Sequence, residues 1–178
     1  MPQVRPDFAR VGKLGYRPPK ALEPAAMPAP VTILVDADAC PVKEEIYRVA
    51  TRHKAQVRIV SNSPFRIPDN ERVKRVVVDG GFDAADNWIA EHADARSVVI
   101  TADILLAERC LKAGARVLAH NGKPFDAASI GGAIATRAIM EDLRAGMDGA
   151  GGGPPPFSKA DRSRFLQELD KVLVKLGR

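Results

Sequence analysis

Residues 31–61 read VTILVDADACPVKEEIYRVATRHKAQVRIVS, and this stretch decides the fold. It contains two short runs of β-branched apolar residues, at 32–35 and 57–60, separated by a segment with helical character at 42–52. Strands joined through a helix in this way lie parallel, with a right-handed crossover. The stretch therefore predicts an α/β domain with a mostly parallel sheet.

The same alternation continues along the chain. Further strands are expected at 75–78, 97–101 and 116–119, and further helices at 84–92, 105–113 and 130–144. Strands that alternate with helices form a central sheet covered by helices on both faces. We expect a three-layer domain spanning about residues 31–145.

The flanks of this domain have a different composition. Residues 1–30 are rich in Pro, Ala and Arg without periodicity, which predicts a disordered basic tail. Residues 146–156 combine glycines with three consecutive prolines, which predicts a linker.

A last helix is expected within residues 157–178. Ser158 and Asp161 resemble a capping box at its start. Its apolar residues recur at helical spacing on one face: Phe165, Leu166, Leu169, Val172, Leu173 and Leu176. We expect this face to dock on the domain, while a homodimer or a protein partner through the same helix stays open.

Composition limits the classes of protein to consider. With 178 residues and 46% hydrophobic composition, the chain can bury one substantial core. No apolar stretch approaches the roughly 18–20 residues of a membrane span, and no secretory signal is evident. Cys40 and Cys110 lack the spacing of a zinc site or disulfide scaffold, so reduced thiols and a cytoplasmic location are expected.

The net charge of +5 does not by itself indicate a nucleic-acid protein. Residues 1–30 contain five basic and two acidic residues, so the tail carries +3 and the rest only +2. A basic tail binds polyanions non-specifically, and a nearly balanced domain gives little support for a large phosphate-binding face.

Aspartates gather where the predicted strands end. Asp36 and Asp38 follow the first strand, Asp103 follows the fourth, and Asp83 and Asp86 lie at the start of the helix between them. The carboxyl ends of parallel strands meet at one edge of the sheet, so these side chains should be neighbours. Crowded carboxylates raise one another's proton affinity, and bound Mg²⁺ or Mn²⁺ relieves that repulsion. Such a metal activates water for attack on a phosphodiester.

These residues also carry a resemblance. The run from Asp86 to Ala90 with Ala93, then the residues from Val99 to Asp103 and from Gly114 to Val117, resemble the second half of PIN-domain nucleases. TADILLA at 101–107 is a motif of a narrower family. With VDADACPVK at 35–43, SNSP at 61–64 and PFSKADR at 156–162, the chain is similar to the bacterial YaiI/YqxD family of uncharacterised PIN-like proteins. The similarity spans nearly everything from residue 31 onward.

The resemblance implies a PIN-like fold and, by analogy, a metal-dependent nuclease, with RNA ranked before DNA as its substrate. By analogy, Asp36, Asp86 and Asp103 would be catalytic metal ligands. Asp38 and Asp83 would be further ligands or would orient a metal-bound water. One departure concerns activity. Many PIN nucleases supply another acidic residue from a helix between the first strand and the Asp86 helix, but Glu44 and Glu45 lie too near Asp36 in sequence and Glu71 falls in a predicted loop.

Two other interpretations remain. A strand ending in Asp36 and Asp38 also matches haloacid-dehalogenase-type phosphatases, with Ser61 as a phosphate-holding hydroxyl, although only about twenty residues separate the first two strands. A PIN-like module that binds RNA, metal or protein without cleavage is the non-enzymatic alternative, because strand-end aspartates are often caps or turn residues.

Candidate substrate contacts surround the aspartates. Ser61 and Asn62 follow the second strand, and Lys43 follows the first motif. A basic run comprises Arg66, Arg72, Lys74 and Arg75. Polar turn residues before a proline and a solvated loop are the simpler explanations for these sets. Cys40 has no histidine beside it, and neighbouring anions should suppress its thiolate, so a packing role is expected.

Overall fold

The structure, a computed structural model, describes residues 29–37, 40–81, 83–145 and 156–177. The predicted tail and linker therefore lie almost wholly outside the described residues, and Asp38 lies outside them too.

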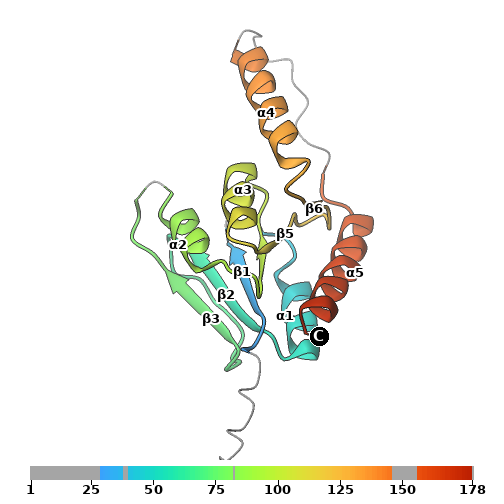
Figure 1. Cartoon of the computed structure of the whole chain (residues 1–178). Coiled ribbons are helices and arrows are strands. Elements are labelled where there is room, and N and C mark those ends of the chain that lie inside the picture. Colours follow the sequence, from blue (N-terminus) through green and yellow to red (C-terminus); the bar gives the residue numbers. More distant parts are fainter. Residues whose placement is uncertain (1–28, 38–39, 82, 146–155, 178) are drawn as a thin grey trace, which may run out of the picture.

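Strands and helices alternate in the order expected (Figure 1). The described elements are β1 (Thr32–Asp36), α1 (Lys43–His53), β2 (Gln56–Ser61), β3 (Val73–Val77), α2 (Ala84–His92), β4 (Ser97–Ile100), α3 (Ile104–Lys112), β5 (Arg116–Leu118), β6 (Pro124–Phe125), α4 (Ile130–Ala145) and α5 (Lys159–Leu176).

Two details differ from the sequence prediction. β3 begins at Val73 rather than at residue 75, because Asn70 closes a turn onto Arg72 and Val73 and the chain becomes extended directly afterwards. Val73 is already buried and pairs with Val57. The short strand β6 was not predicted, since two residues starting with proline give no periodic signal, yet proline is tolerated at a sheet edge.

In the described residues the strands form one six-stranded sheet in the order β3-β2-β1-β4-β5-β6. The pairs from β3 to β5 are parallel and only β5–β6 is antiparallel, which confirms the mostly parallel α/β fold. The chain moves outward from β1 to β3 and then returns to the other side of β1 as β4. The loops after β1 and β4 therefore diverge, and in open α/β sheets ligands bind at this kind of switch point.

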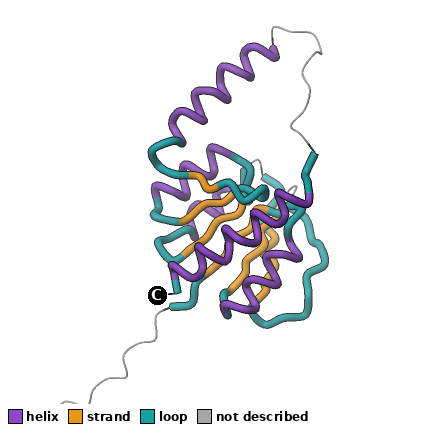
Figure 2. Tube along the Cα trace, turned by 90° about the vertical axis from the view of Figure 1, so that its right-hand side faces the viewer, coloured by secondary structure: helices purple, strands orange, loops and turns teal. Residues whose placement is uncertain are grey.

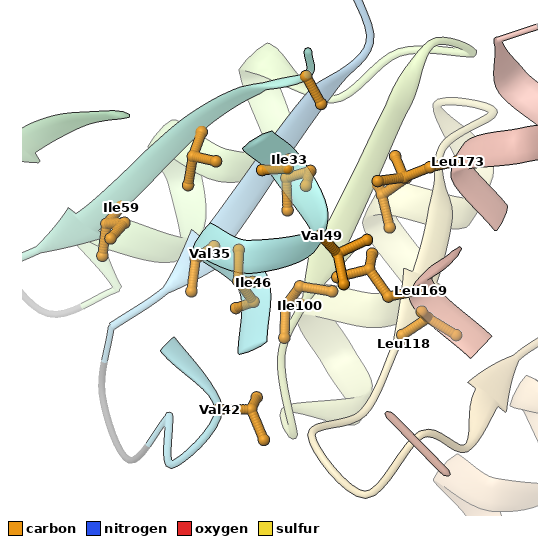
Figure 3. Close-up of a cluster of buried hydrophobic side chains, with 14 of the residues drawn as sticks. Ile33, Val35, Val42, Ile46, Val49, Ile59, Ile100, Leu118, Leu169 and Leu173 are labelled. Atoms are coloured by element: carbon orange, nitrogen blue, oxygen red, sulfur yellow. The ribbon is translucent and has the colours of Figure 1, made fainter. Parts of the chain in front are cut away.

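Alternate strand residues point into two cores. On one face, Ile33 and Val35 of β1 pack with Ile46 and Val49 of α1 and with α5, as Figure 3 shows. On the other face, Leu34 packs against the apolar sides of α2 and α3. Burial on both faces explains why the inner strands are apolar throughout, and Figure 2 shows the helices on either side of the strands.

The last helix completes the first of these cores. Phe165, Leu169 and Leu173 of α5 are at most 2% exposed and pack beside α1. The predicted capping box is present, because Ser158 Oγ accepts from the Asp161 N–H at 3.1 Å and Asp161 Oδ2 accepts from the Ser158 N–H at 2.9 Å. The apolar stripe of α5 is thus used within the chain.

The turn before β6 touches the start of α5. Gly122 has φ +81°, and a Cβ at this position would lie 2.6 Å from the backbone nitrogen of Phe165. Only glycine fits such a close approach in the left-handed region. The contact holds the β5–β6 turn against the helix that closes the core.

The helix α4 extends away from the sheet and from the helices packed on it. Figures 1 and 2 both show it extending beyond the sheet, and its Ile139 and Met140 are 60% and 48% exposed. Its start is anchored through Ile130 and Ile134, which pack with α3 and its neighbours. None of the helices in the described part of the chain has the length and apolar character to cross a bilayer.

Candidate functional site

A threonine hydroxyl joins the ends of the two central strands. β1 ends at Asp36, and Thr101 follows the last residue of its neighbour β4. The buried Thr101 hydroxyl donates to Asp36 Oδ2 at 3.1 Å and accepts from the Asp103 N–H at 3.0 Å. The first and fourth strand motifs therefore meet through one side chain that the sequence analysis assigned only to a strand.

Asp103 is fixed by the helix that it precedes. As the N-cap of α3 it accepts from the backbone N–H groups of Leu105 at 2.7 Å and Leu106 at 3.3 Å. Arg137 of α4 lies 3.6 Å from the same oxygen, Oδ1. Within the described part of the chain all of these contacts fall on Oδ1, so Oδ2 keeps its capacity to bind a ligand.

The pKa of Asp86 depends on its burial and on the carboxylates around it. Its pKa is raised from 3.8 to about 6, first by burial and then by the charges of Asp36, Asp103 and Asp83, which outweigh the opposing effect of Arg109. Asp86 lies in the first turn of α2. The charges of three of the predicted aspartates therefore act on a fourth, Asp86, while the fifth, Asp38, lies outside the described residues.

Asp83 differs from the other three. It precedes α2 in the left-handed conformation, with φ 59°, and its side chain makes no capping hydrogen bond to the described residues of that helix. Aspartate tolerates this conformation better than most residues do, although at some energetic cost. The carboxylate is therefore not used to start the helix, and it adds charge to the exposed side of the cluster.

The four described carboxylates do not form a ready-made metal cage. Among the described residues, no three Asp, Glu, His or Cys side chains lie close enough together to hold an ion. Their chemistry nevertheless suits Mg²⁺ or Mn²⁺, which prefer hard oxygen ligands. Burial is the main reason for the raised pKa of Asp86, and the charges of the neighbouring carboxylates, which a cation would offset, raise it further.

Two arginines border the cluster on its α3 and α4 side. Arg137 contacts Asp103 and also donates to Glu141 at 2.7 Å within α4. Arg109 of α3 donates to Asn87 Oδ1 at 2.9 Å and is exposed. These guanidinium groups supply positive charge beside the carboxylates, and arginine suits the recognition of phosphate oxygens.

The predicted substrate contacts have mixed surroundings. Ser61 is buried and its hydroxyl closes a turn with Ser63, which agrees with its interpretation as a polar turn residue. Asn62 is exposed. Lys43 Nζ lies 5.0 Å from the centre of the Phe65 ring. Arg66 is exposed and lines a hollow beside β3. Their proposed roles in binding stay predictions.

A second charged pair joins the starts of α1 and α5. Glu45 is 5% exposed and its Oε1 accepts from Arg162 at 2.6 Å, while Oε2 is buried without a hydrogen bond from any described residue. The partners are far apart in sequence, so no local pattern indicated them. They tie the first turn of α1 to the first turn of α5.

The charge of Asp36 also affects the pKa values of Cys40 and His120. Burial raises the pKa of the Cys40 thiol, and the charges of Asp36 and Glu45 add to this effect while Lys43 opposes it. The expected suppression of the thiolate is therefore present, with burial as its main cause. Burial lowers the pKa of His120, and the charge of Asp36 acts in the opposite direction. This histidine therefore lies near the site, although it belongs to no ligand pattern in the sequence.

Comparison with known proteins adds a family. Residues 34–175 match the model of a family described as "Uncharacterized BCR, YaiI/YqxD family". The chain is 72% identical over 152 residues to a UPF0178 protein of Sphingopyxis alaskensis, covering 85% of this chain and 98% of that one. It is 55% identical over 157 residues to a UPF0178 protein of Azorhizobium caulinodans, covering 86% and 96%. No solved structure matches, so the PIN likeness rests on sequence motifs alone.

Proposed function

Because this chain belongs to the YaiI/YqxD family, and because aspartates from three of its elements crowd the switch point of the sheet, we propose that it is a divalent-metal-dependent nuclease acting on RNA. The observation that carries the proposal is the Thr101 hydroxyl, which donates to Asp36 and accepts from the Asp103 N–H and so joins the acidic ends of β1 and β4. The raised pKa of Asp86, caused first by burial and then by the charges of its acidic neighbours, agrees with it. A set of carboxylates that disfavour one another's ionisation is typical of a functional site.

The aspartates, Thr101 and two arginines would each have a separate role in this reaction. Asp36, Asp86 and Asp103 would hold the ion, with Asp83 and Asp38 as further predicted ligands. When bound, Mg²⁺ or Mn²⁺ would lower the pKa of water and balance charge on the phosphodiester. Thr101 orients Asp36, and the N-terminus of α3 orients Asp103. Arg109 and Arg137 would attract the phosphate and stabilise its developing negative charge.

A non-catalytic binding module is the second candidate, favoured by the lack of a ready-made cage among the described residues. The phosphatase interpretation has less support, since α1 is the only described helix or strand between β1 and β2, which leaves little room for a substrate cap.

The test combines cleavage with metal binding. Purified protein is incubated with labelled single-stranded and structured RNA in Mn²⁺ or Mg²⁺, beside the double variant Asp36→Asn, Asp103→Asn. Asparagine keeps an acceptor oxygen for Thr101 and for the cap of α3 but removes the charge. Asp126→Asn is the matched control, because Asp126 also accepts backbone N–H groups just before a helix.

Cleavage and metal-dependent stabilisation by the wild type and the control, but not by the double variant, would support the nuclease. Metal-dependent stabilisation without cleavage would favour the binding module. Equal cleavage by the double variant would show that the activity does not come from this site.

A further inference from the structure

A hollow of about 750 Å³ lies beside the edge strand β3. It is lined by Pro64, Phe65, Arg66, Ile67, Val73, Lys74 and Arg75. The hollow is wide open to solvent, so a ligand would lie across it rather than inside it. Within the described sheet β3 pairs with β2 alone, so the outer side of β3 is open and an extended chain can lie along it.

The lining combines positive charge with an apolar floor. Arg66 and Lys74 are exposed, Arg75 is exposed beside them, and no acidic residue of the described chain lines the hollow. Phe65 and Ile67 are partly buried and pack on the core beneath. The Arg75 guanidinium donates to the Phe65 carbonyl oxygen, which fixes the loop that carries the ring to the strand. The loop that carries Phe65 is therefore held against the strand that supplies Lys74 and Arg75.

Lys43 connects this hollow to the acidic site. Its ammonium lies 5.0 Å from the centre of the Phe65 ring, and it belongs to the first turn of α1, which follows β1 and Asp36. Its charge and that of Asp36 both act on the Cys40 thiol that lies between them in sequence. Lys43 thus places one positive charge beside the Phe65 ring, at the start of the helix that follows β1 and Asp36.

We infer that this hollow binds a single-stranded segment of RNA and guides it to the acidic site. A base would stack on the exposed part of Phe65, while phosphates would contact Arg66, Lys74 and Arg75. Aromatic stacking beside a cationic groove is how proteins hold single strands without sequence preference. A duplex keeps its bases stacked inside and cannot offer one to the ring. The inference rests on the proposed function only for what happens to the RNA after binding.

Binding is measured without metal, so that it is separated from cleavage. The full chain carrying Asp36→Asn is titrated in EDTA against fluorescently labelled oligouridine, a duplex of equal length and an oligoglutamate peptide, at several salt concentrations. The variants are Arg66→Glu with Lys74→Glu, and Phe65→Leu, which keeps an apolar side chain. Arg116→Glu is the control, because Arg116 is exposed at the start of β5 in the other half of the sheet.

The expected result is preferential binding of the single strand. The double charge reversal should lower the slope of log affinity against log salt by about 1.4, since each phosphate contact on a single strand contributes about 0.7. Phe65→Leu should weaken binding about tenfold with little change in slope, as for the loss of one stacked base. Arg116→Glu should change neither quantity beyond the general effect of one charge.

Other outcomes would overturn the inference. Equal weakening by Arg116→Glu would show non-specific attraction, and an unchanged affinity in both hollow variants would place the RNA elsewhere. Equal or tighter binding of the duplex would exclude single-strand recognition. Tighter binding of oligoglutamate would identify an acidic peptide added along β3 as the ligand. A protein that binds at the hollow but cuts no RNA would keep this inference while the nuclease proposal fails.

Discussion

Asp86 should weaken the fold at neutral pH, and Asp86→Asn should therefore stabilise it. Raising a carboxyl pKa from 3.8 to about 6 corresponds to about 3 kcal/mol for a group fully shielded from solvent. Because Asp86 is only half-buried, solvent screening reduces this figure, and we expect about 1 kcal/mol. For a chain of this size that amounts to a rise in Tm of about 2–4 °C.

The sign of the effect depends on pH. The Asp86 carboxyl is harder to ionise in the folded protein than in the unfolded chain, so its ionisation favours unfolding. The loss of stability is absent well below about pH 4, where both states are protonated. It grows as the pH rises toward the folded pKa of about 6 and is complete above that value. The asparagine variant carries no charge at this position, so only the wild type should show this loss.

Thermal and urea denaturation at pH 4, 6 and 8 in EDTA would measure the difference. Asp69→Asn is the control, because it also removes a carboxylate but lies in an exposed loop away from the cluster. The reasoning would be refuted if Asp86→Asn were no more stable than the wild type at pH 8. An equal gain at pH 4 and pH 8 would also refute it, because the gain would then not come from ionisation.

Three further changes test the structural roles assigned above. Thr101→Val removes the hydroxyl between Asp36 and Asp103 and should cost about 1–3 kcal/mol in urea denaturation, whereas Thr101→Ser should keep most of the stability. Leu169→Ala should cost about 2–5 kcal/mol by calorimetry because it opens a cavity between α5 and the sheet, and a similar loss for the exposed Val174→Ala would contradict this. Ser158→Ala breaks the capping box and should lower stability by about 1 kcal/mol by chemical denaturation, with no comparable loss for Ser163→Ala within α5.

The fold was largely predictable because its signals are local. Apolar strands separated by helical segments indicated the parallel sheet, and Ser158 with Asp161 marked the start of α5. The errors arose where a local pattern was too short or was decided by a turn. β6 has only two residues, and the turn at Asn70 sets the start of β3 earlier than its apolar run suggested.

The site was predictable as a region but not as a network. The rule that parallel strands end at one edge predicted that Asp36 and Asp103 are neighbours, and Thr101 contacts both of them. The charges of both aspartates also act on Asp86. The Thr101 bridge and the Glu45–Arg162 pair depend on how distant elements pack, and no residue spacing encodes that information. Nor did any pattern assign Arg137 to Asp103, because α4 reaches the site from well beyond it in the chain.

The position of α5 also affects how the protein is made. All strands of the described sheet precede α5 in the chain, yet α5 covers the face formed by residues such as Ile33 and Ile100. A ribosome therefore completes the whole sheet before the helix that closes one of its cores has emerged. During that interval the nascent chain presents an apolar surface, which chaperones or neighbouring chains can bind. The exposure ends when α5 has left the ribosome and packs on this face.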